Sequence, residues 1–129
     1  MSKAHHRGAL IVGAALATAA VAAIPALATN VVKIDSKVTI SHRAPAFHGK
    51  VKSDNSGCKP DRKVKLFRKR HGHDRLLGHD RTDNRGKWKV EVDPLSSGAY
   101  YAKVTRRAEG AAGTIFVCRR DRSKTVVVD

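Results

Sequence analysis

The sequence is poor in acidic residues, cysteine and aromatic residues, and it lacks the motifs that mark common enzyme active sites. It contains no nucleophile elbow, no H-E-x-x-H motif, no phosphate-binding loop and no pair of carboxylates in a cleft-forming segment. These absences argue against catalysis and against a cofactor. We therefore expect a non-enzymatic protein, and a small hydrolase is the least favoured of three functional classes.

Sustained helical periodicity is also missing after residue 28. Apolar and polar residues alternate with a period of two instead, and turn residues, including residues 110–113, separate the runs. The predicted strands cover residues 38–40, 47–53, 63–68, 75–79, 87–92, 100–105, 114–118 and 124–128. Short alternating runs of this kind predict an all-β chain, folded as a single antiparallel β-sandwich of about seven strands.

The first 28 residues have the three parts of a secretory signal peptide. A basic start precedes an apolar run over residues 8–24, and Ala26-Leu27-Ala28 supplies the small residues of a cleavage site. The apolar run is short for a bilayer span, which needs about 20 residues. We expect a cleavable signal helix, Thr29 at the mature N-terminus and a secreted or cell-surface protein. An uncleaved N-terminal anchor remains the alternative.

The length of 129 residues suits one folded domain. After the signal segment we expect an N-terminal arm and a first short strand over residues 29–45, with residues 29–36 loosely held. Residues 46–129 would form the β-sandwich. The chain has two cysteines, Cys58 and Cys118. An even pair in an oxidising compartment predicts one disulfide, whereas free thiols or a metal pair fit export poorly.

Five features follow one another in an order that resembles a known module. They are Gly49-x-Val51, the loop cysteine Cys58, residues 62–67, the T-D-x-x-G-x-W hairpin at residues 82–88, and residues 98–104. The order resembles the carboxypeptidase-regulatory-like, or transthyretin-like, β-sandwich modules of exported bacterial proteins, and it covers about residues 46–129. The resemblance implies a fold without catalytic residues, and a fold alone does not assign a function.

Three histidines, His71, His73 and His79, have the only metal-like spacing in the sequence. Two histidines two residues apart project to the same side of a strand. The neighbouring positive charges would repel a divalent cation, so we expect no metal site.

Positive charge is the most unusual property of the chain, with 26 Lys and Arg against 11 Asp and Glu and a formal net charge of +15. Such a field attracts polyanions, and we expect cell-wall phosphate polymers or acidic glycans as partners. Specific binding of nucleic acid is not expected, and a membrane would be contacted only through the leader before cleavage. The candidate polyanion-binding residues are Lys63, Lys65, Arg68, Lys69, Arg70, Arg75, Lys87 and Lys89.

The strands around Lys63 and Lys65 and around Lys87 and Lys89 would share one solvent face if both belonged to one sheet. Phe67 and Tyr101 fall out of phase with their neighbours, which indicates positions facing outward or into a second interface. The expected function is a surface or extracellular binding or structural module with affinity for anionic polymers. A secreted cationic effector acting on anionic envelopes is the runner-up, and a purely solubilising surface is the third interpretation of the charge.

Overall fold

The computed structural model describes residues 30–129, so the predicted signal peptide and Thr29 lie outside the described residues. Within residues 30–129 the chain is all-β, as the sequence predicts, and its one helical element is a short 3-10 turn. The elements in chain order are β1 (Asn30–Ile34), β2 (Lys37–Val38), β3 (Ser41–Arg43), β4 (Ala46–Lys52), η1 (Ser56–Cys58), β5 (Lys63–Arg68), β6 (Arg75–Arg81), β7 (Lys87–Glu91), β8 (Gly98–Val104), β9 (Arg107–Ala111), β10 (Thr114–Cys118), β11 (Asp121–Arg122) and β12 (Val126–Val128).

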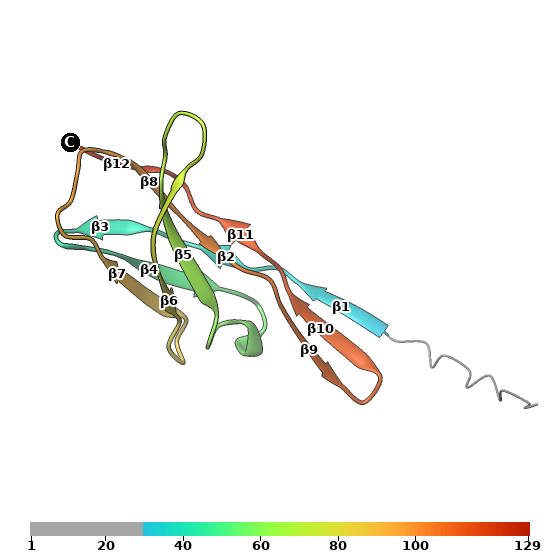
Figure 1. Cartoon of the computed structure of the whole chain (residues 1–129). Helices are drawn as coiled ribbons and strands as arrows, with labels where there is room; N and C mark the ends of the chain where they lie inside the picture. Colours follow the sequence, from blue (N-terminus) through green and yellow to red (C-terminus); the bar gives the residue numbers. More distant parts are fainter. Residues whose placement is uncertain (1–29) are drawn as a thin grey trace, which may run out of the picture.

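Two larger sheets share one hydrophobic core (Figure 1). The five-stranded sheet has the order β11-β8-β5-β6, with β12 also paired to β8. In the four-stranded sheet, β2, β3 and β7 all pair with β4. The rings of Phe47 in β4 and Tyr100 in β8 meet across the core with centroids 4.7 Å apart. Val64 and Leu66 in β5 are fully buried, whereas Lys63 and Lys65 between and beside them face outward.

The predicted strand at residues 38–40 straddles a break between β2 and β3. Trp88 explains the break, because its indole Nε1 donates a hydrogen bond to the carbonyl of Thr39, 3.1 Å away. Gly49 makes room for this contact, since a Cβ atom there would lie 1.9 Å from the Thr39 carbonyl oxygen. Val38 and Ile40, on either side of the break, are both core residues. Residues before position 46 therefore contribute to the core.

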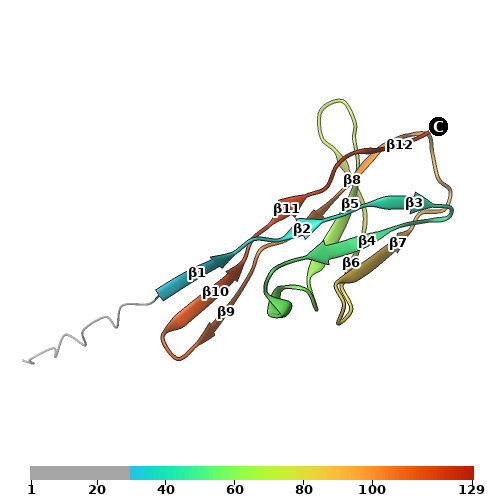
Figure 2. The same ribbon diagram turned by 180° about the vertical axis from the view of Figure 1, so that it is seen from behind.

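A third sheet, which we call the arm, projects from the two larger ones (Figures 1 and 2). Its order is β1-β10-β9, with β1 parallel and β9 antiparallel to β10. The sequence-based prediction that residues 29–36 are loosely held was wrong for β1, because its residues pair with β10 from Asn30 to Ile34. Residues 110–113 were predicted as a turn, but β9 continues to Ala111, and only the end of that segment turns.

The base of the arm is fixed covalently. Cys58, in η1, and Cys118, at the end of β10, form the predicted disulfide, with Cα atoms 5.5 Å apart. The bridge confirms the pairing expected from the sequence, and it fits an oxidising compartment.

Arg62 fixes the same junction from inside. Its side chain is fully buried, and Nη1 donates to the Cys58 carbonyl at 2.7 Å and to Ser36 Oγ at 2.8 Å. Nη2 donates to the carbonyls of Thr105 and Arg119 at 2.9 and 3.0 Å. Burial, together with repulsion from Arg107, lowers the pKa of Arg62 to about 10, so the guanidinium stays charged at neutral pH. One buried cation thus joins the segments before and after the arm.

Candidate functional site

A row of four basic side chains crosses the outer surface of the five-stranded sheet. The strand register places His79 of β6 opposite Lys65 of β5, Lys65 opposite Lys103 of β8, and Lys103 opposite Arg122 of β11. Neighbouring strands lie about 4.8 Å apart, so Lys65, Lys103 and Arg122 form a ladder of positive charge perpendicular to the strands, with the His79 imidazole at its β6 end. Lys63 and Arg81 form a further opposed pair on the same surface. We call these six residues, with Phe67 and Tyr101, the basic face.

Like charges on directly opposite positions of a sheet destabilise it, by roughly 0.2–1 kcal/mol for each pair. Within residues 30–129, Lys65, Lys103 and Arg122 make no ion pair that would offset this repulsion. Arg81 alone among the cations of the basic face meets a carboxylate, that of Asp61, at 3.4 Å. The cross-strand pairs of the ladder therefore lower the stability of the sheet, and other contacts of the fold must compensate for this repulsion.

Two aromatic rings lie beside the ladder. Phe67 and Tyr101 are stacked with ring centroids 5.4 Å apart and an angle of 12° between their planes. The Arg122 guanidinium lies 3.8 Å from the Tyr101 ring centroid, and Lys103 Nζ lies 5.3 Å from that of Phe67. Cations over ring faces are attracted by the ring quadrupole, which holds both side chains flat against the sheet. The aromatic pair thus positions two cations of the ladder.

Asp74, in the loop between β5 and β6, also contacts the basic face. Its Oδ2 accepts a hydrogen bond from the Tyr101 hydroxyl at 2.5 Å, and its Oδ1 accepts one from the Arg70 backbone N–H at 3.1 Å. These two bonds lower the pKa of Asp74 below 3.8. Burial and the same hydrogen bond raise the pKa of Tyr101 above 10. Tyr101 is therefore a neutral donor at physiological pH, and it closes the loop over one end of the basic face.

A shallow groove of about 760 Å³ runs along the edge of the basic face. Five of its lining residues are cations, and Asp121 is the one carboxylate among them. Asp121 is turned toward the four-stranded sheet, where its Oδ2 accepts a hydrogen bond from the Val38 N–H at 2.9 Å. The lining cations are Lys65, Lys103, Arg106, Arg120 and Arg122. The groove can hold an anionic chain whose charged groups meet successive cations.

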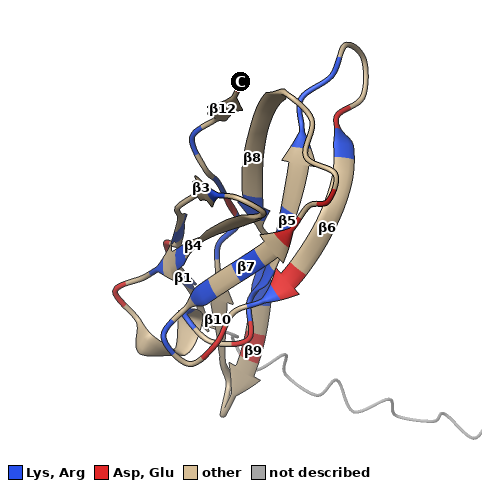
Figure 3. Cartoon of the chain, turned by 90° about the vertical axis from the view of Figure 1, so that its left-hand side faces the viewer, with Lys and Arg blue, Asp and Glu red and all other residues tan. Residues whose placement is uncertain are grey.

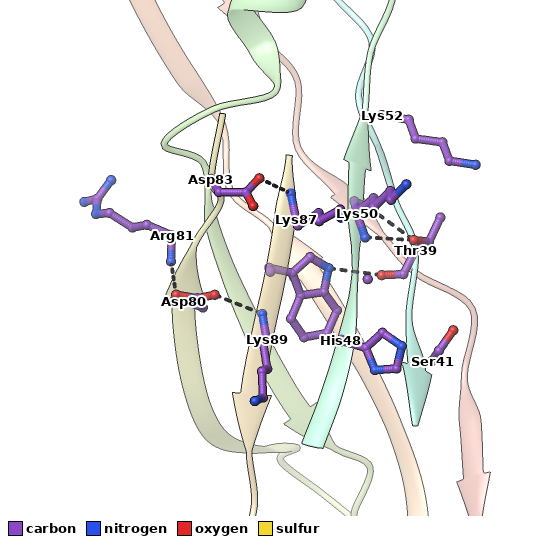
Figure 4. A pocket seen from close by; sticks show the side chains of 12 residues that line it. Thr39, Ser41, His48, Lys50, Lys52, Asp80, Arg81, Asp83, Lys87 and Lys89 are labelled. Atoms are coloured by element: carbon purple, nitrogen blue, oxygen red, sulfur yellow. Dashed lines mark hydrogen bonds between the residues drawn. The ribbon is translucent and has the colours of Figure 1, made fainter. Parts of the chain in front are cut away.

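The outer surface of the four-stranded sheet carries a second groove, of about 780 Å³ (Figure 4). Its lining mixes charges, because Asp80 and Asp83 stand among the lysines and Lys89 pairs with Glu91 at 3.2 Å. Asp80 accepts from the Lys89 backbone N–H, and Asp83 accepts from the Lys87 N–H, both at 2.9 Å. Trp88 lies at its floor with only 2% of its surface exposed and its N–H already bonded. This groove offers no exposed Phe, Tyr or Trp ring, and its two carboxylates reduce the net positive charge of its lining.

The structure separates the eight candidate residues predicted from the sequence (Figure 3). Lys63 and Lys65 belong to the basic face, but Lys87 and Lys89 lie in β7, which pairs with β4 in the other sheet. The condition that both pairs of lysines share one sheet is therefore not met. The reason is that β6 and β7 are consecutive strands that pair with different partners.

The remaining predicted cations lie at one end of the basic face. Arg68 is half-buried, and its Nη2 donates to the Ser97 carbonyl at 2.7 Å, which gives it a structural contact. Lys69 and Arg70 lie in the exposed loop before β6, and Arg75 begins that strand opposite Arg68. These residues extend the positive charge beyond Phe67 and away from the groove.

The principal residues of the basic face that the predicted set omitted are Lys103 and Arg122. Lys103 follows Tyr101 in the outward phase of β8, and Phe67 occupies the same phase of β5. The outward positions of Phe67 and Tyr101 could therefore have indicated from the sequence that Lys103 lies on the same surface. Arg122 lies in a two-residue strand, which leaves no alternation to detect.

The three histidines do not form a metal centre with other ligands. Among the described residues, no group of three or more His, Cys, Asp or Glu side chains could hold a metal ion. His79 belongs to the basic ladder, whereas His71 and His73 lie in the exposed loop before β6.

No protein-family model matches the chain, and no curated protein or solved structure matches it significantly. Residues 30–129 contain no helix long and apolar enough to cross a membrane.

Proposed function

We propose that this protein is an exported, non-enzymatic binding module that holds anionic polymers on its basic face. The observation that carries the proposal is the ladder beside His79, in which Lys65, Lys103 and Arg122 lie directly opposite one another without carboxylates between them. A bound polyanion would remove the repulsion that the fold otherwise tolerates. Cell-wall phosphate polymers and acidic glycans have repeated anionic groups that suit a repeated row of cations.

The proposal includes the finer architecture and the cellular location. The two larger sheets would form one antiparallel β-sandwich with seven strand positions, where β2 and β3 share one position and β11 and β12 share another. Such a sandwich would suit the carboxypeptidase-regulatory-like resemblance of residues 46–129. Export rests on the signal-peptide pattern of residues 1–28, and the disulfide is consistent with it.

The test compares two double variants that remove the same charge from opposite sheets. Lys63→Gln with Lys65→Gln changes the basic face, and Lys87→Gln with Lys89→Gln changes the mixed-charge surface. Binding of fluorescently labelled poly(glycerol phosphate) and of a polyuronate is measured by anisotropy as salt is raised. The basic-face variant should lower the slope of log affinity against log salt concentration by about two. The other variant should leave the slope nearly unchanged.

Both proteins must unfold at nearly the wild-type temperature, which exposed substitutions permit because they usually cost under about 0.5 kcal/mol. Equal losses from the two variants would mean that only net charge matters. Binding that persists in half-molar salt would contradict an electrostatic site. Either result would leave the positive charge as a solubilising coat.

A further inference from the structure

The outer half of the arm is a sheet with apolar side chains on both faces. Val31, Val32 and Phe116 are 54%, 42% and 39% exposed, and they are three of the five large hydrophobic residues exposed in residues 30–129. Val31 pairs with Ile115, and Val32 pairs with Phe116. Because successive side chains alternate across a strand, these two pairs lie on opposite faces. Water therefore meets apolar side chains on either side of this single layer.

Charge is sparse in the same region. Residues 30–32 and 110–118 contain no ionisable side chain other than the disulfide-bonded Cys118, in a chain where 29% of residues are charged. The first charged neighbour is Glu109, the strand partner of Phe116, and its carboxylate is paired with Arg107 at 3.4 Å. Cations appear again at the base of the arm. Lys33, Arg106, Arg119 and Arg120 surround Val117 in a groove of about 290 Å³. The arm thus has an apolar end and a positively charged base.

We propose that the arm docks on a lipid surface containing anionic headgroups, with its apolar end among the acyl chains and the basal groove at the phosphates. A strand rises about 3.3 Å per residue, so residues 114–116, up to the level of Glu109, span roughly 7 Å. Interfacial elements bury their apolar part about 5–10 Å deep. The apolar part of the arm, which ends at the Glu109–Arg107 ion pair, falls within that depth. Arg and Lys near an anionic surface then add attraction that decays within a Debye length.

The position of Asn30 shows which end of the arm lies nearest to the preceding segment of the chain. Its backbone N–H donates to the Gly113 carbonyl at 3.1 Å, so the described chain begins beside the β9–β10 turn at the end of the arm (Figure 2). The apolar run of the sequence, residues 8–24, ends only a few positions earlier. A leader retained in a bilayer would place the arm at that bilayer, and a cleaved leader would leave the exposed apolar end as the contact.

A second copy of the chain is the competing occupant of the arm, because β1 and β9 each have an edge that pairs with no other strand of residues 30–129. Docking two arms would bring their basal cations toward each other on molecules of +15 formal charge. An anionic lipid surface can bury the apolar end in its acyl chains and attract the basal cations to its phosphates. A second copy of the chain can bury only the apolar end. The charge therefore favours lipid.

The test places a fluorescent reporter on the arm of the full chain. Phe116→Trp is mixed with vesicles of phosphatidylcholine and phosphatidylglycerol in equal parts, and Val127→Trp is the control. Val127 is 69% exposed and lies in β12, at the opposite end of the molecule from the arm (Figure 1). The arm reporter should shift to shorter wavelength and be quenched by brominated lipids, relative to the wild-type signal of Trp88. The β12 reporter should change little.

A charge comparison within Phe116→Trp completes the test. Lys33→Gln with Arg119→Gln should lower the vesicle affinity, measured from the lipid dependence of the shift, about thirtyfold. Lys50→Gln with Lys52→Gln, the same charge loss on the four-stranded sheet, should leave it within about twofold. Equal quenching of both reporters, or no quenching at Phe116→Trp, would overturn the proposal. A shift that appears without vesicles as protein concentration rises would identify a second copy as the occupant, and Val31→Trp repeats the measurement if Phe116→Trp does not fold.

Discussion

Arg62 shows how one side chain determines the geometry of a junction. Its guanidinium is fully buried yet meets carbonyl and hydroxyl oxygens, and no carboxylate is among its hydrogen-bond partners within residues 30–129. A buried charge is tolerated only when hydrogen bonds replace its lost hydration. The donors of Arg62 also satisfy carbonyls that strand pairing leaves free. The cation and the carbonyls thus depend on one another.

Replacing Arg62 by Met should lower the free energy of unfolding by about 2–4 kcal/mol. The carbonyls of Cys58, Thr105 and Arg119 would lose a donor, at a cost of about 1–3 kcal/mol each, while removal of a buried charge offsets part of that loss. Urea unfolding measures the difference. Arg85→Met, at an exposed turn, is the matched control and should change stability by less than about 0.5 kcal/mol. Equal values for the two variants would contradict a structural role for Arg62.

The hydrogen bond between Tyr101 and Asp74 predicts a pH effect. The pKa of Asp74 in the folded protein lies below 3.8, so its stabilising contribution is complete above pH 3.8 and is lost as pH falls through the lower folded value. Tyr101→Phe removes the largest cause of the shift and should raise the pKa of Asp74 toward 3.8. NMR titration of the carboxyl carbons measures this.

Asp83 provides an internal reference for that titration. Its pKa is also lowered, chiefly by the backbone N–H of Lys87, and Tyr101 does not contribute. The pKa of Asp83 should be the same in wild type and Tyr101→Phe. A pKa of Asp74 that does not move in the variant would show that Tyr101 does not hold the loop.

Strand phase explains which residues could be placed from the sequence. Lys63 and Lys65 alternate with Val64 and Leu66, so their outward positions follow directly from the pattern. Arg62 lies two residues before Val64, so the alternation of the strand predicts that its side chain also points inward. Its positive charge suggests exposure instead, and the burial of Arg62 was therefore not predicted. Charge alone suggests exposure, but the few buried arginines depend on carbonyl partners that are distant in sequence.

At the scale of elements, the arm was the least predictable part. β10 has the β-branched and aromatic residues of a strand, and the sequence predicts it correctly over residues 114–118. β9, with the sequence RAEGA, has low strand propensity and is a strand because it pairs with β10. β1 pairs in parallel with a strand near the other end of the chain, and no local pattern reports such a partner.

Reduction of the Cys58–Cys118 disulfide should lower the melting temperature by several degrees or more. The two cysteines are 60 positions apart, and the chain-entropy model gives about 4 kcal/mol for a loop of this size. Scanning calorimetry with and without reductant measures the change. Hydrogen exchange should increase first in β1 and β10, because the bridge lies at the base of the arm. Reactive thiols in the native oxidised protein would contradict the pairing.

At the scale of the whole molecule, the same electrostatics should act on stability and on binding in opposite directions. Half-molar salt shortens the Debye length to about 4 Å, so it screens the repulsion among the unpaired cations of the basic face. The melting temperature should therefore rise by a few degrees with added salt, while affinity for poly(glycerol phosphate) falls.

Lys103→Glu tests whether the ladder is the source of the salt effect. The substitution places an acid between Lys65 and Arg122, so stability at low salt should increase and its salt dependence should decrease. Polymer affinity should fall in the same variant. A melting temperature that drops with added salt in the wild type would show that self-repulsion is not significant.

The parallel pairing of β1 with β10 also sets the order in which the protein can be completed. Asp35 and Arg119, at the base of the arm, interact across 84 positions of sequence. β1 is synthesised before every other described strand, yet it cannot pair until β10 has emerged. Contacts between such distant residues form slowly, because a long loop must close first. An apolar strand edge is therefore open throughout synthesis, and its protection until the last strands arrive is a requirement for any cell that makes this chain.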